Sequence, residues 1–170
     1  MGIRQLYFCA LVFLASSIQN LHAQNSESEL RAAYIFNFAK YIKWPTDHQT
    51  FVIGVYGTDT EAFDALERTL KGKKIAGKEI QIKIFETFID IASCQILYCP
   101  DIENKRLTTL LEMLVGKSVL LVTKEDLVKR GAMISFIVEN DKLRFKIKKD
   151  ALDRAGLVPT EGLLRLAILL

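Results

Sequence analysis

Short apolar segments alternate with amphipathic ones between residues 51 and 122, and this alternation limits the possible folds more than any other sequence feature. The predicted strands are Phe51–Tyr56, Glu79–Phe85, Ile96–Cys99 and Ser118–Val122. The predicted helices between them are Thr58–Leu70 and Asn104–Val115. Strands that alternate with helices form βαβ units, so the pattern predicts a parallel sheet covered by helices on both faces.

The segment after residue 122 completes the predicted sheet. Met133–Val138 and Leu143–Ile147 flank a polar turn and indicate a β-hairpin, which adds antiparallel pairing. Short helices are predicted at Lys124–Lys129 and Lys149–Ala155, and a last apolar helix at Glu161–Leu170. We therefore expect a single α/β domain with a mixed, mainly parallel sheet in a three-layer sandwich.

The first 23 residues have the composition of a secretory signal peptide. They carry one charge, Arg4, then an apolar run from Leu6 to Ala15, and the small residue Ala23 precedes a polar stretch. An uncleaved membrane anchor is the alternative, but the apolar run is shorter than the roughly 20 residues that span a bilayer. The sequence predicts export, cleavage near Ala23 and a domain over residues 24–170.

Two cysteines, Cys94 and Cys99, follow the predicted signal peptide. Export makes a disulfide between them a possibility. The residues between them indicate a buried strand, however, and five extended residues span about 16 Å where a disulfide needs Cα atoms within about 7 Å. Two buried free thiols are the favoured interpretation, and a disulfide would mean that the strand is wrong.

The residues offer little catalytic or metal-binding chemistry. His48 is the one histidine after residue 23, and zinc sites need three or four Cys or His ligands. A hydrolase using Cys99 or His48 would need the two side chains close together, which the sequence cannot show. The net charge of +3 predicts no nucleic-acid surface. We predict no enzyme activity, no metal and no cofactor.

An aromatic-rich helix is predicted to end before Trp44-Pro45. Five aromatic residues fall within residues 34–44, and aromatic side chains are common both in cores and at interfaces. Packing against the sheet and contact with a partner are both open interpretations. The predicted inward stripe is Leu30, Ala33, Tyr34, Phe38 and Tyr41.

The segment Leu30-Arg-Ala-Ala-Tyr-Ile-Phe-Asn-Phe-Ala-Lys-Tyr-Ile-Lys-Trp-Pro45 resembles the opening of the YfiR-like family of exported bacterial regulators. The resemblance continues in order over the rest of the chain. It includes Phe51–Gly57, Cys94–Tyr98, Ser118–Val122, Gly131–Phe136 and Leu143–Ile147. This sequence departs from the family pattern at Ala132, Lys146 and Lys148, where the family usually has Gly, Glu and Asn.

The resemblance implies a non-catalytic periplasmic protein that represses a membrane-anchored diguanylate cyclase or sensor kinase in response to envelope signals. It also implies a homodimer. Exposed parts of the aromatic helix and of the hairpin are the expected partner contacts, namely Tyr41, Trp44, Phe136, Phe145 and Lys146.

The alternative function is a periplasmic sensor module that binds a small molecule. Ligands of α/β folds bind beyond the carboxyl ends of the strands, so the expected place is a crevice around Gly57–Asp59.

Overall fold

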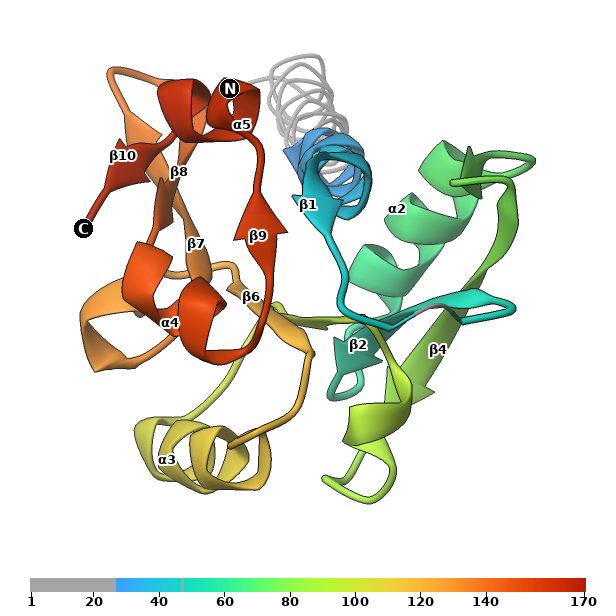
Figure 1. Ribbon diagram of the computed structural model, residues 1–170, viewed down its shortest axis with the longest axis horizontal. Coiled ribbons are helices and arrows are strands. Elements are labelled where there is room, and N and C mark those ends of the chain that lie inside the picture. Colours follow the sequence, from blue (N-terminus) through green and yellow to red (C-terminus); the bar gives the residue numbers. More distant parts are fainter. Residues whose placement is uncertain (1–26, 47) are drawn as a thin grey trace, which may run out of the picture.

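The structure is a computed structural model that describes residues 27–46 and 48–170 (Figure 1). The predicted signal peptide, Met1–Ala23, lies outside the described residues. The N-terminal helix is described over residues 27–41. The strands are β1 (Ile42–Lys43), β2 (Phe51–Tyr56), β3 (Lys74–Ile75), β4 (Lys78–Phe85), β5 (Ile96–Cys99), β6 (Leu120–Thr123), β7 (Ile134–Glu139), β8 (Lys142–Ile147), β9 (Val158–Pro159) and β10 (Ile168–Leu169). The helices are α2 (Thr60–Leu70), α3 (Asn104–Met113), α4 (Lys149–Arg154) and α5 (Glu161–Leu166), with 3₁₀ turns η1 (Ile91–Ser93) and η2 (Val128–Arg130).

Eight strands form one sheet in the order β10-β8-β7-β6-β5-β2-β4-β3. The five central strands, in the order β7-β6-β5-β2-β4, are parallel to one another. At the two sides of this group, β8 runs antiparallel to β7 and β3 runs antiparallel to β4. Ile53 of β2 pairs with Ile82 of β4 on one side and Ile96 of β5 on the other. The prediction of a mixed, mainly parallel sheet is confirmed.

Helices cover both faces of this sheet (Figure 1). The N-terminal helix and α2 lie over one face, and α3 lies over the other, which confirms the three-layer arrangement. Every residue of β2, β5 and β6 is buried, as expected of central parallel strands with helices on both sides. At the start of α2, the Asp59 carboxylate accepts a hydrogen bond from the Ala62 N–H at 2.9 Å.

The N-terminal helix buries a different stripe from the predicted one. Ala32, Ile35, Phe38 and Ala39 are buried, whereas Leu30 and Tyr41 are 47% and 44% exposed. The helix is apolar around most of its circumference, so helical periodicity alone does not fix the buried side. Packing against the sheet and against α2 determines which side of the N-terminal helix is buried.

The hairpin prediction is confirmed. Asn140 and Asp141 connect β7 to β8 with φ of 52° and 57°. Two consecutive left-handed residues make a type I′ turn, whose twist matches that of the two strands, and Asn and Asp tolerate this conformation better than most residues.

Two predicted helices differ in the structure. The segment Lys124–Lys129 contains no α-helix, and only the 3₁₀ turn η2 forms there, because the Ser135 hydroxyl accepts from Leu127 N at 3.1 Å and holds the loop. The last helix ends at Leu166, and β10 then pairs in parallel with β8, with Leu170 N donating to Ile147 O at 3.0 Å. Pairing here satisfies the backbone edge of β8, which outweighs local helix propensity.

Candidate functional site

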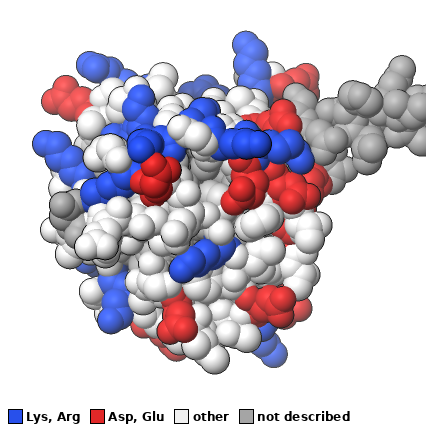
Figure 2. Space-filling view, turned by 90° about the vertical axis from the view of Figure 1, so that its right-hand side faces the viewer, with Lys and Arg blue, Asp and Glu red and all other residues white. Residues whose placement is uncertain are grey.

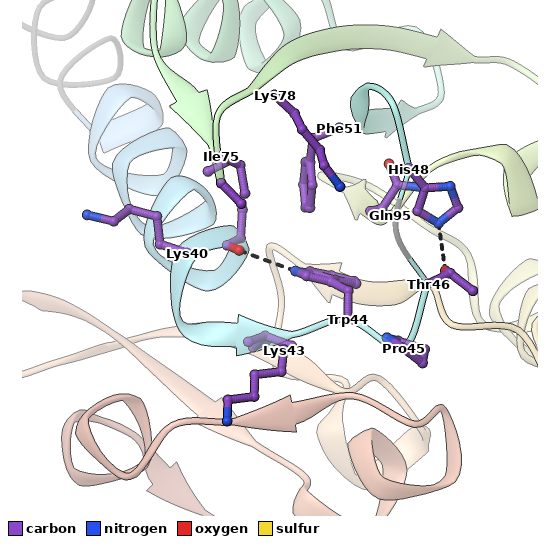
Figure 3. A pocket seen from close by; sticks show the side chains of 13 residues that line it. Lys40, Lys43, Trp44, Pro45, Thr46, His48, Phe51, Ile75, Lys78 and Gln95 are labelled. Atoms are coloured by element: carbon purple, nitrogen blue, oxygen red, sulfur yellow. Dashed lines mark hydrogen bonds between the residues drawn. The ribbon is translucent and has the colours of Figure 1, made fainter.

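A hollow of about 630 Å³ surrounds the Trp44-Pro45 turn (Figure 3). We call it the Trp44 hollow. Its apolar lining comes from Ala39, Ile42, Trp44, Pro45, Phe51, Ile75 and Ala76. Its polar lining comes from Lys40, Lys43, Thr46, His48, Lys78 and Gln95. The hollow is therefore built where the N-terminal helix ends and β2 and β4 begin.

The indole of Trp44 is fixed on both its polar and its apolar side. Its Nε1–H donates to the Ala39 carbonyl oxygen at 3.2 Å, and its ring meets Phe51 edge to face with centroids 5.2 Å apart. The last carbonyls of a helix lack intrahelical partners, so Trp44 caps the end of the N-terminal helix. The Trp-Pro sequence thus ends the helix and also forms one wall of the hollow.

The polar groups of the Trp44 hollow make hydrogen bonds that position them. Gln95 Oε1 accepts from Val52 N at 2.7 Å, and Thr46 Oγ1 lies 2.7 Å from His48 Nε2. Lys78 extends toward Phe51 and Gln95 (Figure 3). None of the lining residues that the structure describes is acidic. The hollow thus offers apolar surface with a basic rim.

The predicted partner contacts do not share one surface. Phe136 and Phe145 are 1% and 2% exposed, and their expected role as surface contacts is wrong for the folded domain. They pack against Phe38, with ring centroids 5.9 Å and 5.0 Å apart, because this face of the hairpin lies under the N-terminal helix. Tyr41 and Trp44 border the exposed end of that helix.

Lys146 lies on the other face of the hairpin from Phe145. Its ammonium forms an ion pair with Asp126 at 2.5 Å, and its side chain is 23% exposed. The ammonium group of Lys146, which was expected to contact a partner, is therefore already paired within the domain. Of the five expected residues, Tyr41 is exposed and Trp44 lines the Trp44 hollow.

A second hollow, of about 350 Å³, lies beyond the carboxyl ends of β2 and β5. We call it the switch crevice, and it coincides with the crevice expected around Gly57–Asp59. Its lining residues are Tyr56, Gly57, Thr58, Asp59, Pro100, Asp101, Ile102, Glu103 and Arg106. The name refers to the change of direction in the strand order at this point. The chain continues from β2 to β4 on one side of β2, whereas β5 pairs with β2 on the other side.

The sequence profile of the family described as YfiR/HmsC-like matches residues 28–168. The chain belongs to this family. Proteins of the YfiR/HmsC-like family are generally non-catalytic periplasmic regulators of signalling. A search of curated proteins found no significant match.

This YfiR/HmsC-like chain does not bring the two candidate hydrolase residues together. His48 lines the Trp44 hollow beside Gln95, whereas Cys99 lies at the opposite end of β5 and is buried. Burial raises the pKa of the Cys99 thiol far above its ordinary value, and the nearby Cys94 raises it further. A nucleophilic cysteine needs a lowered pKa, so the structure gives no support to this hypothesis.

Both cysteines are free thiols in the structure of this YfiR/HmsC-like protein. The Cys94 thiol donates to the Ile91 carbonyl at 3.0 Å, and burial raises its pKa to about 12. The strand between the cysteines is confirmed as β5, which keeps the two side chains apart along the sheet.

Over residues 27–46 and 48–170, no group of three or more His, Cys, Asp or Glu side chains is arranged to hold a metal ion. No helix in the same ranges is long and apolar enough to cross a bilayer. On the face in Figure 2, basic and acidic side chains are interspersed along the upper edge rather than gathered into a field of one sign.

Several residues of the Trp44 hollow were missed by sequence reasoning. Ile75, Lys78 and Gln95 come from a short edge strand, from the start of β4 and from the residue before β5. The pairing of β4 with β2 brings the first two to the hollow, and Gln95 is oriented by its bond to Val52 N. No local sequence pattern predicts contacts that form only when distant segments pair in the folded chain.

Proposed function

We propose that this YfiR/HmsC-like protein is a non-catalytic periplasmic regulator that binds and represses a membrane-anchored signalling protein. The partner is a diguanylate cyclase or a sensor kinase, and the contact is with its periplasmic sensing domain. The family match over residues 28–168 is the observation that carries this proposal. Export of the chain through a signal peptide at Met1–Ala23 and dimer formation are parts of the same proposal.

The proposed contact surface is the Trp44 hollow together with Tyr41, whose ring lies against the lining residue Lys40. Tyr41 is 44% exposed, and the Lys40 ammonium lies 5.3 Å from the centroid of its ring. Exposed aromatic side chains beside an apolar depression are typical of the anchors that dominate binding energy at interfaces. The basic rim at Lys40 and Lys43 would favour a partner segment that carries acidic residues.

Repression by direct contact requires a difference in affinity. The regulator must bind the inactive conformation of the signalling protein more tightly than the active one, because equal affinity shifts no equilibrium. A difference of about 5 kcal/mol moves a partner from mostly active to mostly inactive. An envelope signal would then act by releasing the regulator.

Crosslinking in the cell envelope tests this proposal. The tagged full chain is expressed in its own host and crosslinked, and captured proteins are identified by mass spectrometry. We expect one enriched inner-membrane cyclase or kinase, and weaker capture by Tyr41→Ala. Val115→Ala is the matched control, because Val115 is also apolar and exposed but follows α3. Equal capture by wild type and Tyr41→Ala would contradict the proposed surface, and the absence of any such protein would contradict the proposed function.

A small-molecule sensor is the second candidate function. The observation that favours it is the switch crevice, whose volume of about 350 Å³ is in the range of small-ligand pockets. A thermal-shift screen of metabolites on the purified protein distinguishes the candidates. A robust shift by one compound, with no membrane partner captured, would support the sensor.

A further inference from the structure

The switch crevice lies at the point of the sheet where ligands of open α/β folds bind. The chain leaves β2 through α2 toward β4, and it leaves β5 through α3 toward β6. The two connections diverge from neighbouring strand ends, which opens the space between them. Both helices therefore begin at the crevice.

Tyr56 supplies a polar group that the described part of the protein does not satisfy. The residue ends β2 and is 3% exposed, and its hydroxyl is buried without a hydrogen-bond partner among the described residues. Nearly all buried polar side-chain atoms in folded proteins have such a partner. A tyrosine hydroxyl is a protonated donor at neutral pH, and burial raises the pKa of Tyr56 further above that range.

Arg106 supplies a cation over the ring of Tyr56. Its guanidinium carbon lies 5.6 Å from the Tyr56 ring centroid and 5.8 Å from that of Phe88. Among the residues that the structure describes, no carboxylate forms an ion pair with it. A stacked guanidinium keeps its N–H edge available for bidentate binding of a carboxylate.

Acidic groups line the same crevice. Asp59 is engaged in capping α2, whereas Asp101 and Glu103 form no ion pair with a described residue, and Glu103 makes no side-chain cap to α3. Three carboxylates against one guanidinium would repel a ligand that is only an anion. A ligand that also carries a positive charge complements both the guanidinium and the carboxylates.

We propose that the switch crevice binds a small zwitterion, with its carboxylate on Arg106 and the Tyr56 hydroxyl and its ammonium beside Asp101 and Glu103. This inference rests on the sensor function proposed above and names its ligand class. It does not depend on the repression of a membrane partner.

An NMR titration of the protein, expressed as the full chain and purified after export, tests this proposal. The probes are 2-aminobutyrate and 4-aminobutyrate, with butyrate and n-butylamine as controls that carry only one of the two charges. We expect the better zwitterion to bind at least about tenfold more tightly than either control, since each lost charged contact weakens binding by about that factor. The amide signals of Gly57, Thr58 and Ile102 should shift.

Two variants and a matched control locate the binding. Arg106→Gln should weaken zwitterion binding about tenfold, and Tyr56→Phe, which removes only the unpartnered hydroxyl, about threefold or more. Lys105→Gln should leave binding unchanged, because Lys105 precedes Arg106 on α3 but does not line the crevice.

The following outcomes would overturn the proposal: no saturable shift with either aminobutyrate, equal binding of butyrate, or unaltered binding by both crevice variants. A metabolite of another charge class that stabilises wild type but not Arg106→Gln would also overturn it, while leaving the sensor function in place. If no metabolite stabilises the protein, both the ligand class and the sensor function fail.

Discussion

Phe38 of the N-terminal helix meets Phe145 of β8 edge to face, with ring centroids 5.0 Å apart and planes inclined by 65°. This contact joins the first described helix to the hairpin near the other end of the chain. Tyr34 and Phe136 extend it, with Tyr34 lying 5.4 Å from Phe145 and 6.0 Å from Phe136. The aromatic residues of the hairpin thus hold the N-terminal helix on the sheet.

Shortening Phe145 should destabilise the fold rather than remove a partner contact. We expect Phe145→Ala to lower the free energy of unfolding by about 3–5 kcal/mol, the usual cost of a cavity left by a buried aromatic ring. Lys146→Ala, one residue along, should cost about 1 kcal/mol or less, because its ion pair with Asp126 is partly exposed. Urea unfolding followed by circular dichroism measures both. Loss of partner capture by Phe145→Ala at unchanged stability would contradict the core assignment.

Trp44 is the only tryptophan in the chain, so its fluorescence reports on the Trp44 hollow. Covering the partly exposed indole with a partner domain should shift its emission to shorter wavelength, because the ring leaves water. A zwitterion in the switch crevice should leave the emission unchanged.

Trp44→Phe provides the control for this measurement. It removes the signal, and with it the hydrogen bond to the Ala39 carbonyl, which should cost about 0.5–1.5 kcal/mol of stability. An emission change that persists in a complex with Trp44→Phe belongs to the partner. No difference between the two complexes would argue against contact at the Trp44 hollow.

The buried thiols should make the free energy of unfolding decrease as the pH becomes alkaline. Burial raises the pKa of Cys94 to about 12, while an unfolded cysteine has a pKa of about 8.5. The folded state therefore retains the proton longer, so this contribution is complete below about pH 8.5 and is lost as the pH rises toward 12. Cys99 acts in the same direction.

Unfolding free energies between neutral and alkaline pH check this expectation. The double variant Cys94→Ala, Cys99→Ala should show a shallower decline than wild type. Alkylation by iodoacetamide near pH 8 should be slow in the native protein and fast in urea. Rapid alkylation without denaturant would show that the thiols are more accessible than their burial indicates.

Two glycines should respond oppositely to alanine. Gly131 has φ of +118°, and a Cβ there would lie 2.6 Å from Leu111 Cδ1, so Gly131→Ala should cost about 1 kcal/mol or more. Gly162 lies within α5 with nothing within 4 Å of a Cβ, so Gly162→Ala should gain about 0.5–1 kcal/mol. Thermal unfolding of the two variants measures the difference. Equal shifts in Tm would refute the conformational argument.

The central strands were predictable because burial on both faces leaves a continuous apolar run, as in Phe51–Tyr56. The last residues were not, because Ile168 and Leu169 suit a helix locally and pair with β8 only in the folded chain. The N-terminal helix was predicted in position but not in rotation, since apolar and aromatic residues such as Ile35 and Tyr41 occur around most of its circumference and packing decides which are buried.

The two hollows differ in how far sequence could locate them. The switch crevice follows from strand order, and Gly57–Asp59 marked it in advance. The Trp44 hollow depends on Ile75, Lys78 and Gln95, which tertiary pairing brings to Trp44 from distant segments. Trp44 itself was expected at the surface, but its role in capping the helix through Ala39 was not.

The short antiparallel ladder between β1 and β9 has a kinetic consequence. It pairs Ile42 with Pro159 and Lys43 with Val158, so one wall of the Trp44 hollow is tied to a segment far along the chain. Contacts between such distant segments close a long loop before they gain any stabilisation, and they slow folding. The β1–β9 ladder should therefore form late in folding. A chain that emerges N-terminus first would complete its proposed partner surface only after its C-terminal elements have folded.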